Sequence, residues 1–269
     1  MSISQVTALI PHHTLSHGRT RPTIVEAEDS DGNRHEVVVK LFLAKERGKK
    51  AAISELVCSL LGTRLALQAP APFLVAIPDG FHELVADPEA RERFRMARGL
   101  QFGSSYVRGA STVSADRGVP VEKRSEAGAV FAFDCLTQNP DRRPEKPNLL
   151  EHSDGYWLID HDMALSFIGE ILIGGPIVPW EPRALGSLAF SFLATHLFTR
   201  GLRAREEALD GFAGALSGLQ VGEIDGMLGL VPAEWWPDRE FPDSLRDYLV
   251  SAVSSADRLI GFAKTFLKS

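Results

Sequence analysis

Patterns typical of β-strands occupy four short segments before residue 108. The first two, residues 23–28 and 34–42, flank the polar run 29–33 (Asp-Ser-Asp-Gly-Asn), which is typical of a hairpin turn. Residues 73–77 and 101–107 are rich in apolar or β-forming residues and lie between turn-forming residues. The pattern therefore predicts a small antiparallel sheet near the N-terminus.

A helical spacing of apolar residues follows in other segments. It is clearest over residues 49–66, and residues 91–98 and 125–137 also predict helices. The apolar stretch between Arg183 and Arg200 is shorter than the roughly 20 residues that a bilayer span needs. We therefore expect a buried helix there and no membrane span.

A second hairpin is predicted near the middle of the chain. Two apolar runs, residues 148–150 and 156–160, flank the turn-forming residues Ser153-Asp154-Gly155. Asn148 and Asp160 each lie six residues from Asp154. In that register the two side chains would face each other at the open end of the hairpin, with Cβ atoms roughly 4.5–5.5 Å apart.

An asparagine and an aspartate in this arrangement could form part of a metal site. An amide oxygen and a carboxylate at this separation can share a divalent cation, and hard oxygen ligands with open positions for phosphate suit Mg²⁺. Asp141 enters the same corner from the preceding polar loop. A carboxylate beside a metal–phosphate site can orient a hydroxyl group and accept its proton during phosphoryl transfer.

Phosphoryl transfer also needs a phosphate anchor, and the N-terminal segment offers candidates. Lys40 lies near the end of a valine-rich strand, and Glu55 lies on the next predicted helix. A lysine held by a glutamate can reach nucleotide phosphates in a fixed position. Upstream, the backbone N–H groups around Gly18 and the side chain of Arg19 could cover the phosphates.

Other polar residues nearby have simpler interpretations. Asp162 is either a second metal neighbour or a helix cap, and we favour the cap. We interpret Asp134 as a structural residue, and we expect His161 to orient the segment that carries Asp160. His12 and His17 have no nearby cysteine or acidic ligand and do not indicate a metal site.

With these motifs the chain resembles the HipA-like kinase family, a branch of the protein-kinase-like fold that also resembles phosphatidylinositol kinases. The resembling segments are residues 18–22, 39–41, 54–56, 102–105, 138–142, 147–150, 157–161 and 230–235. The resemblance implies an α+β, two-lobed protein-kinase-like fold, with an N-terminal antiparallel sheet plus helix and a mostly helical C-terminal lobe. Glycine, serine and charged residues concentrate around residues 108–124. We therefore expect an ATP-phosphate-binding lobe over residues 1–108, and a lobe with the catalytic loop, metal site and acceptor region over residues 109–269.

The resemblance also implies roles for individual residues. ATP would lie between the lobes, with Lys40 on its phosphates and Glu55 steadying that lysine. Asp141 would be the catalytic base, and Asn148 and Asp160 would be the magnesium ligands. The chain departs from ordinary protein kinases in having no G-x-G-x-x-G loop, and its interval from Asp141 to Asn148 is longer than the usual one.

Composition and charge exclude some classes of function and location. The chain has 35 acidic and 29 basic residues and a net charge of −6. This balance argues against a primary nucleic-acid binder, which usually carries a basic face. Cys58 and Cys135 lie in apolar runs without metal-site spacing and predict reduced core thiols. The first eighteen residues contain no Lys or Arg and predict no signal peptide, so we expect a cytoplasmic protein.

The function that we favour from the sequence is ATP- and Mg²⁺-dependent phosphotransfer to a hydroxyl acceptor, as a protein Ser/Thr kinase of the HipA-like type. Two alternatives stay open. The acceptor could be a lipid head group or a small molecule, since the predicted acceptor region has no recognisable code. The chain could also be a catalytically silent nucleotide-binding or scaffold domain. The expected partners are ATP and an unknown hydroxyl acceptor.

Overall fold

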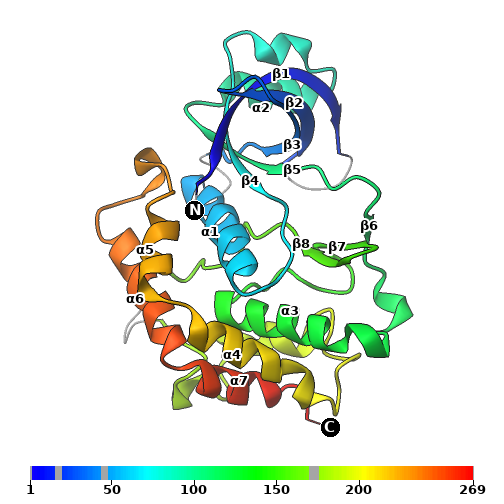
Figure 1. Ribbon diagram of the computed structural model, residues 1–269, viewed down its shortest axis with the longest axis vertical. Coiled ribbons are helices and arrows are strands. Elements are labelled where there is room, and N and C mark those ends of the chain that lie inside the picture. The colour runs from blue at the N-terminus through cyan, green and yellow to red at the C-terminus, as the bar shows by residue number, and fades with distance from the viewer. Residues whose placement is uncertain (1, 16–19, 44–47, 170–175, 269) are drawn as a thin grey trace.

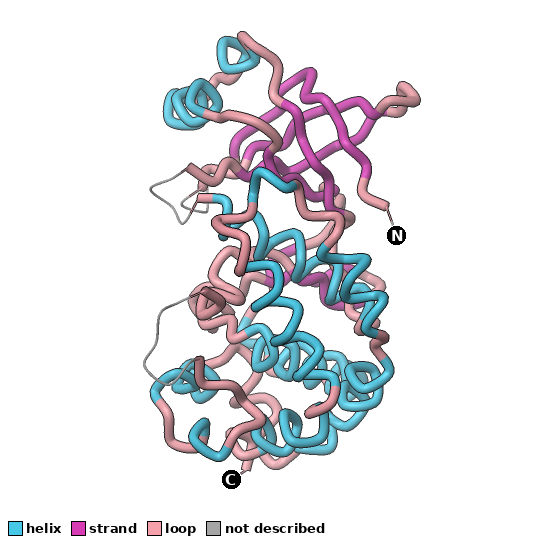
Figure 2. Tube along the Cα trace, turned by 90° about the vertical axis from the view of Figure 1, so that its left-hand side faces the viewer, coloured by secondary structure: helices cyan, strands magenta, loops and turns pink. Residues whose placement is uncertain are grey.

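A small β-barrel stands above a larger, mostly helical part in the computed structural model, which describes residues 2–15, 20–43, 48–169 and 176–268 (Figure 1). A quarter turn shows the same arrangement, with most strands in the upper part and most helices below (Figure 2). The protein therefore has the mixed α+β class predicted from the sequence, with an N-terminal sheet and a mainly helical C-terminal part.

Five strands form the barrel in the order β1-β2-β3-β5-β4: β1 (Ser4–Thr14), β2 (Thr23–Asp29), β3 (Arg34–Lys40), β4 (Pro72–Ala76) and β5 (Gln101–Ser105). Neighbouring strands run antiparallel except β1 and β4, which pair in parallel and close the barrel. The predicted antiparallel sheet is therefore confirmed for four of the five strand pairings and is wrong for the pairing of β1 with β4. The sequence pattern does not mark β1, because its pairing is irregular after Ala8 and Pro11 and only Val6 and Ala8 are buried.

Alternation along β3 decides which side of the barrel wall Lys40 faces. Val37 and Val39 point into the barrel, where they belong to its apolar core. Successive side chains of a strand point to opposite faces, so Lys40 points out of the barrel. There it meets α1 (Lys49–Arg64), which lies directly below the barrel in Figure 1.

The lower part contains a small sheet and most of the helices. The sheet consists of β6 (Ser111–Thr112), β7 (Leu149–His152) and β8 (Gly155–Leu158), and the helices besides α1 and α2 are α3 (Arg124–Thr137), α4 (Asp210–Gly218), α5 (Val221–Leu228), α6 (Phe241–Val253) and α7 (Ala256–Lys264). The short helix α2 (Pro88–Met96) packs beside the barrel instead.

Helix α1 belongs to the core of the lower part, although barrel strands precede and follow it in sequence. Its residues from Ala51 to Gly62 are all buried. The segment Ala233–Trp235, a 3₁₀ helix, and α5 contact α1, as do the barrel strands β4 and β5. A helix buried all round has no polar stripe, so Glu55 in its middle requires charged partners.

The buried helix expected between Arg183 and Arg200 forms only in part, as a short 3₁₀ helix with one exposed side. Leu188–Thr195 forms a 3₁₀ helix, and the side chain of Leu188 is 87% exposed. Phe190, Leu193 and His196 are buried, which follows the three-residue repeat of a 3₁₀ helix. An apolar composition alone does not distinguish these two helix types.

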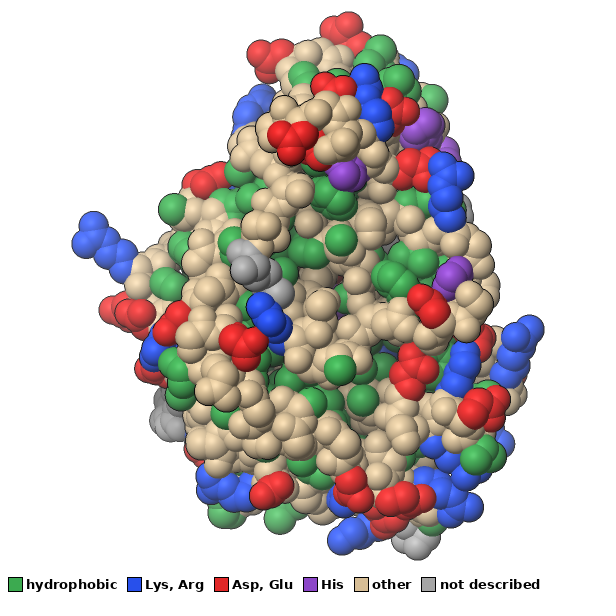
Figure 3. Space-filling model, in the orientation of Figure 1, with side chains coloured by type: hydrophobic (Ala, Val, Ile, Leu, Met, Phe, Trp, Pro, Cys, Tyr) green, Lys and Arg blue, Asp and Glu red, His purple; other side chains and the backbone are tan. Residues whose placement is uncertain are grey.

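The structure also bears on the predictions about the cysteines, membrane spans and surface charge. Cys58 and Cys135 are free and fully buried, as predicted. Within the described parts of the chain, no helix combines the length and apolar character that a membrane span needs. On the face shown in Figure 3, acidic and basic side chains are interspersed and form no continuous basic patch.

Candidate active site

Lys40 is the centre of a buried cluster of charges between the barrel and the helical part. Its ammonium group donates hydrogen bonds to the carboxylate of Glu55 and, over 2.8 Å, to Oδ1 of Asp160. Lys40 and Glu55 are both buried. The structure thus contains the Lys40–Glu55 pair expected from the sequence and adds Asp160, which lies 120 residues from Lys40, as a second partner.

Mutual charge stabilisation keeps all three side chains ionised. Burial alone would lower the pKa of Lys40, but the charges of Asp160 and Glu55 raise it above its usual value. Burial would raise the pKa of Glu55 and of Asp160, yet the ammonium group of Lys40 holds both below their usual values, and Lys146 assists at Asp160. The cluster is therefore a fixed arrangement of charges.

Glu55 also connects α1 to the segment after β8. The backbone N–H of His161 donates to Oε2 of Glu55 over 3.0 Å, and the His161 ring nitrogen Nδ1 lies 3.6 Å from the same oxygen. His161 is fully buried. Its contacts fit the predicted role of orienting the segment that carries Asp160.

The β7–β8 hairpin forms, but its register differs by one residue from the prediction. His152 pairs with Gly155 across a two-residue turn, so Asn148 lies opposite Ile159 instead of Asp160. The turn is centred between Ser153 and Asp154 rather than on Asp154. The proposed face-to-face pair of Asn148 and Asp160 is therefore wrong as a cross-strand pair.

Backbone conformation nevertheless brings both ends of the hairpin into the site. Asn148 and Asp160 have φ angles of 46° and 61°, in the left-handed region that residues with a side chain rarely adopt. The alternation of side chains between the two faces of a strand therefore does not extend to Asn148 and Asp160. The side chain of Asn148 donates from Nδ2 to the carbonyl oxygen of Asp141 over 3.0 Å and to its Oδ2 over 3.2 Å.

Three carboxylates meet at this corner. Oxygen atoms of Asp141, Asp160 and Asp162 all lie within 4.8 Å of one another. The favoured interpretation of Asp162 as a helix cap is wrong, because only turns follow it in the described residues up to 169. Burial, then the charges of Asp160 and Glu55, raise the pKa of Asp162 to about 6.

Lys146 is a member of the site that the sequence analysis missed. Its ammonium group contacts the carboxylate of Asp141 and lies 3.2 Å from Oδ2 of Asp160. The only signal in the sequence is a lysine two positions before Asn148, in a loop with several other charged residues. Its reach to Asp160 depends on tertiary structure.

A buried network fixes the loop that carries Asp141. Asp134 accepts a hydrogen bond from Nε of Arg142 over 2.5 Å, and its Oδ2 lies 2.9 Å from Nε2 of His196. Arg142 also donates to the backbone carbonyl of Asn148. Burial would raise the pKa of Asp134, but Arg142 and His196 lower it. The predicted structural role of Asp134 agrees with this network.

The remaining predicted residues, Gly18 and Arg19, lie outside the described residues. The nucleotide cover assigned to them stays a prediction.

The donor set at the corner fits a magnesium ion. Mg²⁺ prefers oxygen ligands and is held in proteins by one or two carboxylates, with further positions for water and phosphate. Asp141, Asp160 and Asp162 supply carboxylate oxygens, and the amide oxygen of Asn148 is a fourth candidate. No sulfur or imidazole donor competes among the groups that meet within 4.8 Å in the described residues.

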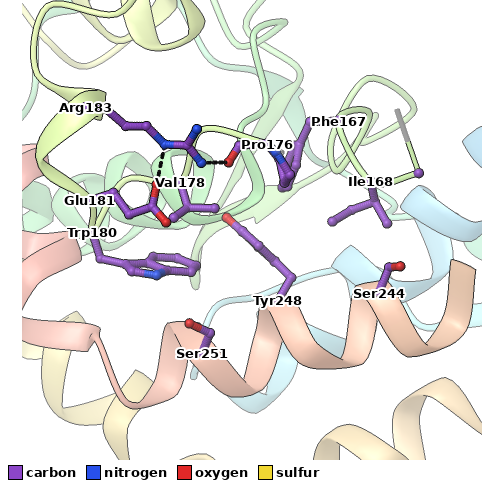
Figure 4. A pocket seen from close by; sticks show the side chains of 11 residues that line it. Phe167, Ile168, Pro176, Val178, Trp180, Glu181, Arg183, Ser244, Tyr248 and Ser251 are labelled. Carbon is purple, nitrogen blue, oxygen red and sulfur yellow. Dashed lines mark hydrogen bonds and ion pairs between the residues drawn. The ribbon is translucent and has the colours of Figure 1, made fainter. Parts of the chain in front are cut away.

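A pocket of about 390 Å³ lies beside the segment that follows the acidic corner. The rings of Phe167 and Trp180 flank Tyr248 of α6, with ring centroids 4.8 and 5.1 Å from that of Tyr248. Figure 4 shows the rings of Trp180 and Tyr248 below the side chain of Arg183, which is bound to Glu181 and to the carbonyl of Pro176. The pocket therefore has aromatic walls and a charged rim.

Hydrogen bonds connect this pocket to the end of α3, just before Asp141. The hydroxyl group of Tyr248 donates to the carbonyl of Leu136, and Nε2 of Gln138 donates to the carbonyl of Ile177 over 3.0 Å. The pocket and the loop that carries Asp141 thus both adjoin the C-terminal end of α3.

Comparisons with known proteins agree with this geometry. Among solved structures, the Helicobacter pylori proinflammatory kinase CtkA is similar with a TM-score of 0.54 and 10% sequence identity, over 98% of this chain and 97% of that chain. At this identity the likeness concerns the fold. The FAT and kinase domain of CtTel1 gives a TM-score of 0.25 and 14% identity, over 94% of this chain and 23% of that chain. This score is too low to indicate a shared fold.

No curated protein sequence matches the chain. The model of the HipA-like kinase family matches residues 10–168, more than half of the chain and all of the charged cluster described above. The chain therefore belongs to the HipA-like kinase family, a family of kinase-type phosphotransferases.

Proposed function

We propose that this protein is an ATP- and Mg²⁺-dependent kinase that phosphorylates a Ser or Thr hydroxyl group of a protein. One observation carries the proposal: the cluster of buried Lys40 and Glu55 with half-buried Asp160 lies next to Asp141, in a chain of the HipA-like kinase family. A fixed lysine, a metal-binding aspartate and an adjacent carboxylate are the groups that phosphoryl transfer from a nucleotide requires.

Each residue then has a defined task. Lys40 binds nucleotide phosphates, and Glu55 fixes the position of its ammonium group. Asp160 and Asn148 hold Mg²⁺, with Asp162 close enough to assist. When bound, this ion neutralises phosphate charge and helps to align the phosphoryl group with its acceptor. Gly18 and Arg19 cover the phosphates in this proposal.

Asp141 is the proposed base. It accepts the proton of the attacking hydroxyl group, while the hydrogen bond from Asn148 holds its carboxylate in place. The proposed division into lobes, residues 1–108 and 109–269, puts Lys40 and Asp141 on opposite sides of the nucleotide. We further propose a cytoplasmic location, where the buried thiols of Cys58 and Cys135 would stay reduced.

The pocket between Trp180 and Tyr248 is the proposed site for an apolar side chain of the acceptor. Its connection to the Asp141 loop through Leu136 and Gln138 supports this assignment. Replacing Trp180 by Ala should raise the KM for the acceptor and leave the KM for ATP unchanged. An equal change in both constants would contradict the assignment.

The first test is transfer itself. Purified wild type and the variants Asp141→Asn and Asp160→Ala are incubated with Mg·ATP, and protein mass and ADP release are measured. We expect phosphate transfer or ADP formation by wild type only, with ATP binding retained in Asp141→Asn. Asp247→Asn is the matched control, because Asp247 is an 80% exposed carboxylate on α6. Undiminished activity of Asp141→Asn would remove Asp141 from the mechanism.

The acceptor is tested by competition among a peptide library, lipid vesicles and small hydroxyl compounds for ATP turnover. Stimulation by Ser- or Thr-containing peptides supports the proposal, and stimulation by a lipid or small molecule alone would assign the site to that acceptor. Nucleotide-dependent thermal stabilisation without any transfer would favour a silent nucleotide-binding domain.

A further inference from the structure

Lys146 occupies the space between the two carboxylates that the proposed reaction uses differently. Its ammonium group contacts Asp141, the proposed base, and Oδ2 of Asp160, the proposed metal ligand. The other oxygen of Asp160 accepts a hydrogen bond from Lys40. Both carboxylate oxygens of Asp160 therefore have a lysine as partner.

The backbone of Lys146 is held in place, and its side chain has solvent on one side. Reciprocal hydrogen bonds of 3.0 Å join the N–H and C=O groups of Lys146 to those of Arg143. The side chain of Lys146 is 42% exposed, in contrast with 10% for Lys40. A half-exposed lysine can move its ammonium group toward solvent without rearrangement of the backbone, although it then loses its carboxylate partners.

We propose that Lys146 acts as a cationic placeholder, which holds Asp141 and Asp160 in the absence of a divalent ion and makes metal binding depend on nucleotide. The inference rests on the proposed function, because it assumes that ATP and a divalent ion share this corner.

The position and charge of Lys146 would link metal binding to nucleotide binding. A divalent ion bound to Asp160 and near Asp141 must displace the ammonium group that now bridges them. Without nucleotide, Lys146 would exchange two carboxylate partners for water. With nucleotide, phosphate oxygens offer it new anionic partners, so displacement costs less. Metal and nucleotide then assist each other's binding, and linkage requires that the effect be reciprocal.

The test measures Mn²⁺ binding by the disappearance of the free-ion electron paramagnetic resonance signal, with and without a non-hydrolysable ATP analogue. In Lys146→Gln we expect Mn²⁺ to bind about fivefold or more tightly without nucleotide, and the gain in Mn²⁺ affinity caused by the analogue to shrink by a similar factor. Lys146→Arg keeps the charge and should retain the coupling of wild type.

Arg143→Gln is the matched control. Arg143 also lies beside Asp141, with Nη2 3.4 Å from Oδ1, but its contacts do not include Asp160 in the described structure. Unchanged or weaker Mn²⁺ binding in Lys146→Gln, or an equal gain in Arg143→Gln, would overturn the inference. If wild type binds neither Mn²⁺ nor the analogue, the proposed function itself fails. Binding of both by wild type with no effect of Lys146→Gln rejects only the placeholder.

Discussion

At the scale of single residues, the site is a chain of charges in which each group needs its neighbours. Lys40 is bound by Glu55 and Asp160, and Asp160 is bound on its other side by Lys146. A buried charge without a partner is strongly unfavourable, and removal of one partner from a buried pair typically costs about 3–5 kcal/mol. The same contacts that would bind nucleotide therefore also contribute to stability.

Replacing Lys40 by Met should weaken ATP binding and lower the free energy of unfolding by about 3 kcal/mol, because Glu55 stays buried without its ammonium partner. The double variant Lys40→Met/Glu55→Gln should recover part of that stability and none of the ATP binding. Urea unfolding and equilibrium nucleotide titration of Lys40→Met, Glu55→Gln and the double variant measure both effects. Additive losses of stability would contradict the coupling.

The Asp134 network predicts a stability that falls in mild acid. Burial, despite the opposing interaction with Asp134, holds the pKa of His196 below its usual value of 6.5, so the folded state favours the neutral ring. The unfolded chain then binds a proton that the folded protein does not. This contribution to stability is present above pH 6.5 and is lost as the pH falls through the lower pKa of the folded state.

In urea unfolding between about pH 7 and pH 5, His196→Gln should show a flatter dependence of stability on pH than wild type does. Gln retains an N–H donor for Asp134, so the comparison isolates the proton. The half-exposed His35, which pairs with Asp29 on the barrel, gives the control variant His35→Gln. Parallel pH profiles of wild type and His196→Gln would reject the assignment.

At the scale of elements, close packing decides details that periodicity does not encode. β5 crosses the barrel wall between β3 and β4, and Gly103 pairs with Val39 on one side and Phe73 on the other. A Cβ atom at Gly103 would lie 2.5 Å from the side chain of Val37 and 2.6 Å from that of Val75. The barrel core therefore requires glycine at this position.

Gly103→Ala should lower the free energy of unfolding by about 1–3 kcal/mol, because the barrel core has no room for a methyl group. Gly211→Ala is the control, since Gly211 lies in α4 without a positive φ, and a Cβ atom added there would have no neighbour within 4 Å. We expect that control to stabilise by about 0.4–1 kcal/mol. Thermal or urea unfolding measures both variants, and equal effects would show that the barrel wall tolerates the methyl group.

At the scale of the whole molecule, two apolar cores meet at the charged site. One fills the barrel, and the other runs through α1, α3 and the C-terminal helices. Lys40 belongs to the barrel wall and Glu55 to the second core, so their ion pair joins the two. The position of α1 therefore controls the geometry of the site.

The C-terminal segment holds the start of α1. Trp235 is fully buried, its ring lies 5.5 Å from Nζ of Lys49, and its indole N–H donates to the carbonyl of Leu100 over 3.2 Å. Trp235→Ala should cost about 3–5 kcal/mol of stability. It should also weaken ATP binding through the displacement of Glu55.

The neighbouring Trp236 is only half-buried, so Trp236→Ala should have a smaller effect on stability and leave ATP affinity unchanged. Denaturant unfolding and nucleotide titration at a temperature where both variants are folded separate stability from affinity. Equal ATP affinity in wild type and Trp235→Ala would show that Glu55 does not depend on this segment.

By itself the sequence determined the local elements and the residue types of the site. Alternation and turn residues marked β2, β3 and the β7–β8 hairpin, and helical spacing marked α1 and α3, because these signals depend on neighbours a few positions apart. The candidate residues Lys40, Glu55, Asp141, Asn148 and Asp160 followed from residue chemistry and from resemblance to a kinase family.

Tertiary structure alone decided how these parts meet. The parallel pairing of β1 with β4 closes the barrel between segments that share no local pattern. A one-residue difference in register placed Asn148 opposite Ile159, and both Asn148 and Asp160, which have left-handed backbone, still contribute side chains to the site. The contacts of Lys40 and Lys146 with Asp160 depend on packing between segments far apart in sequence, which no short-range periodicity encodes.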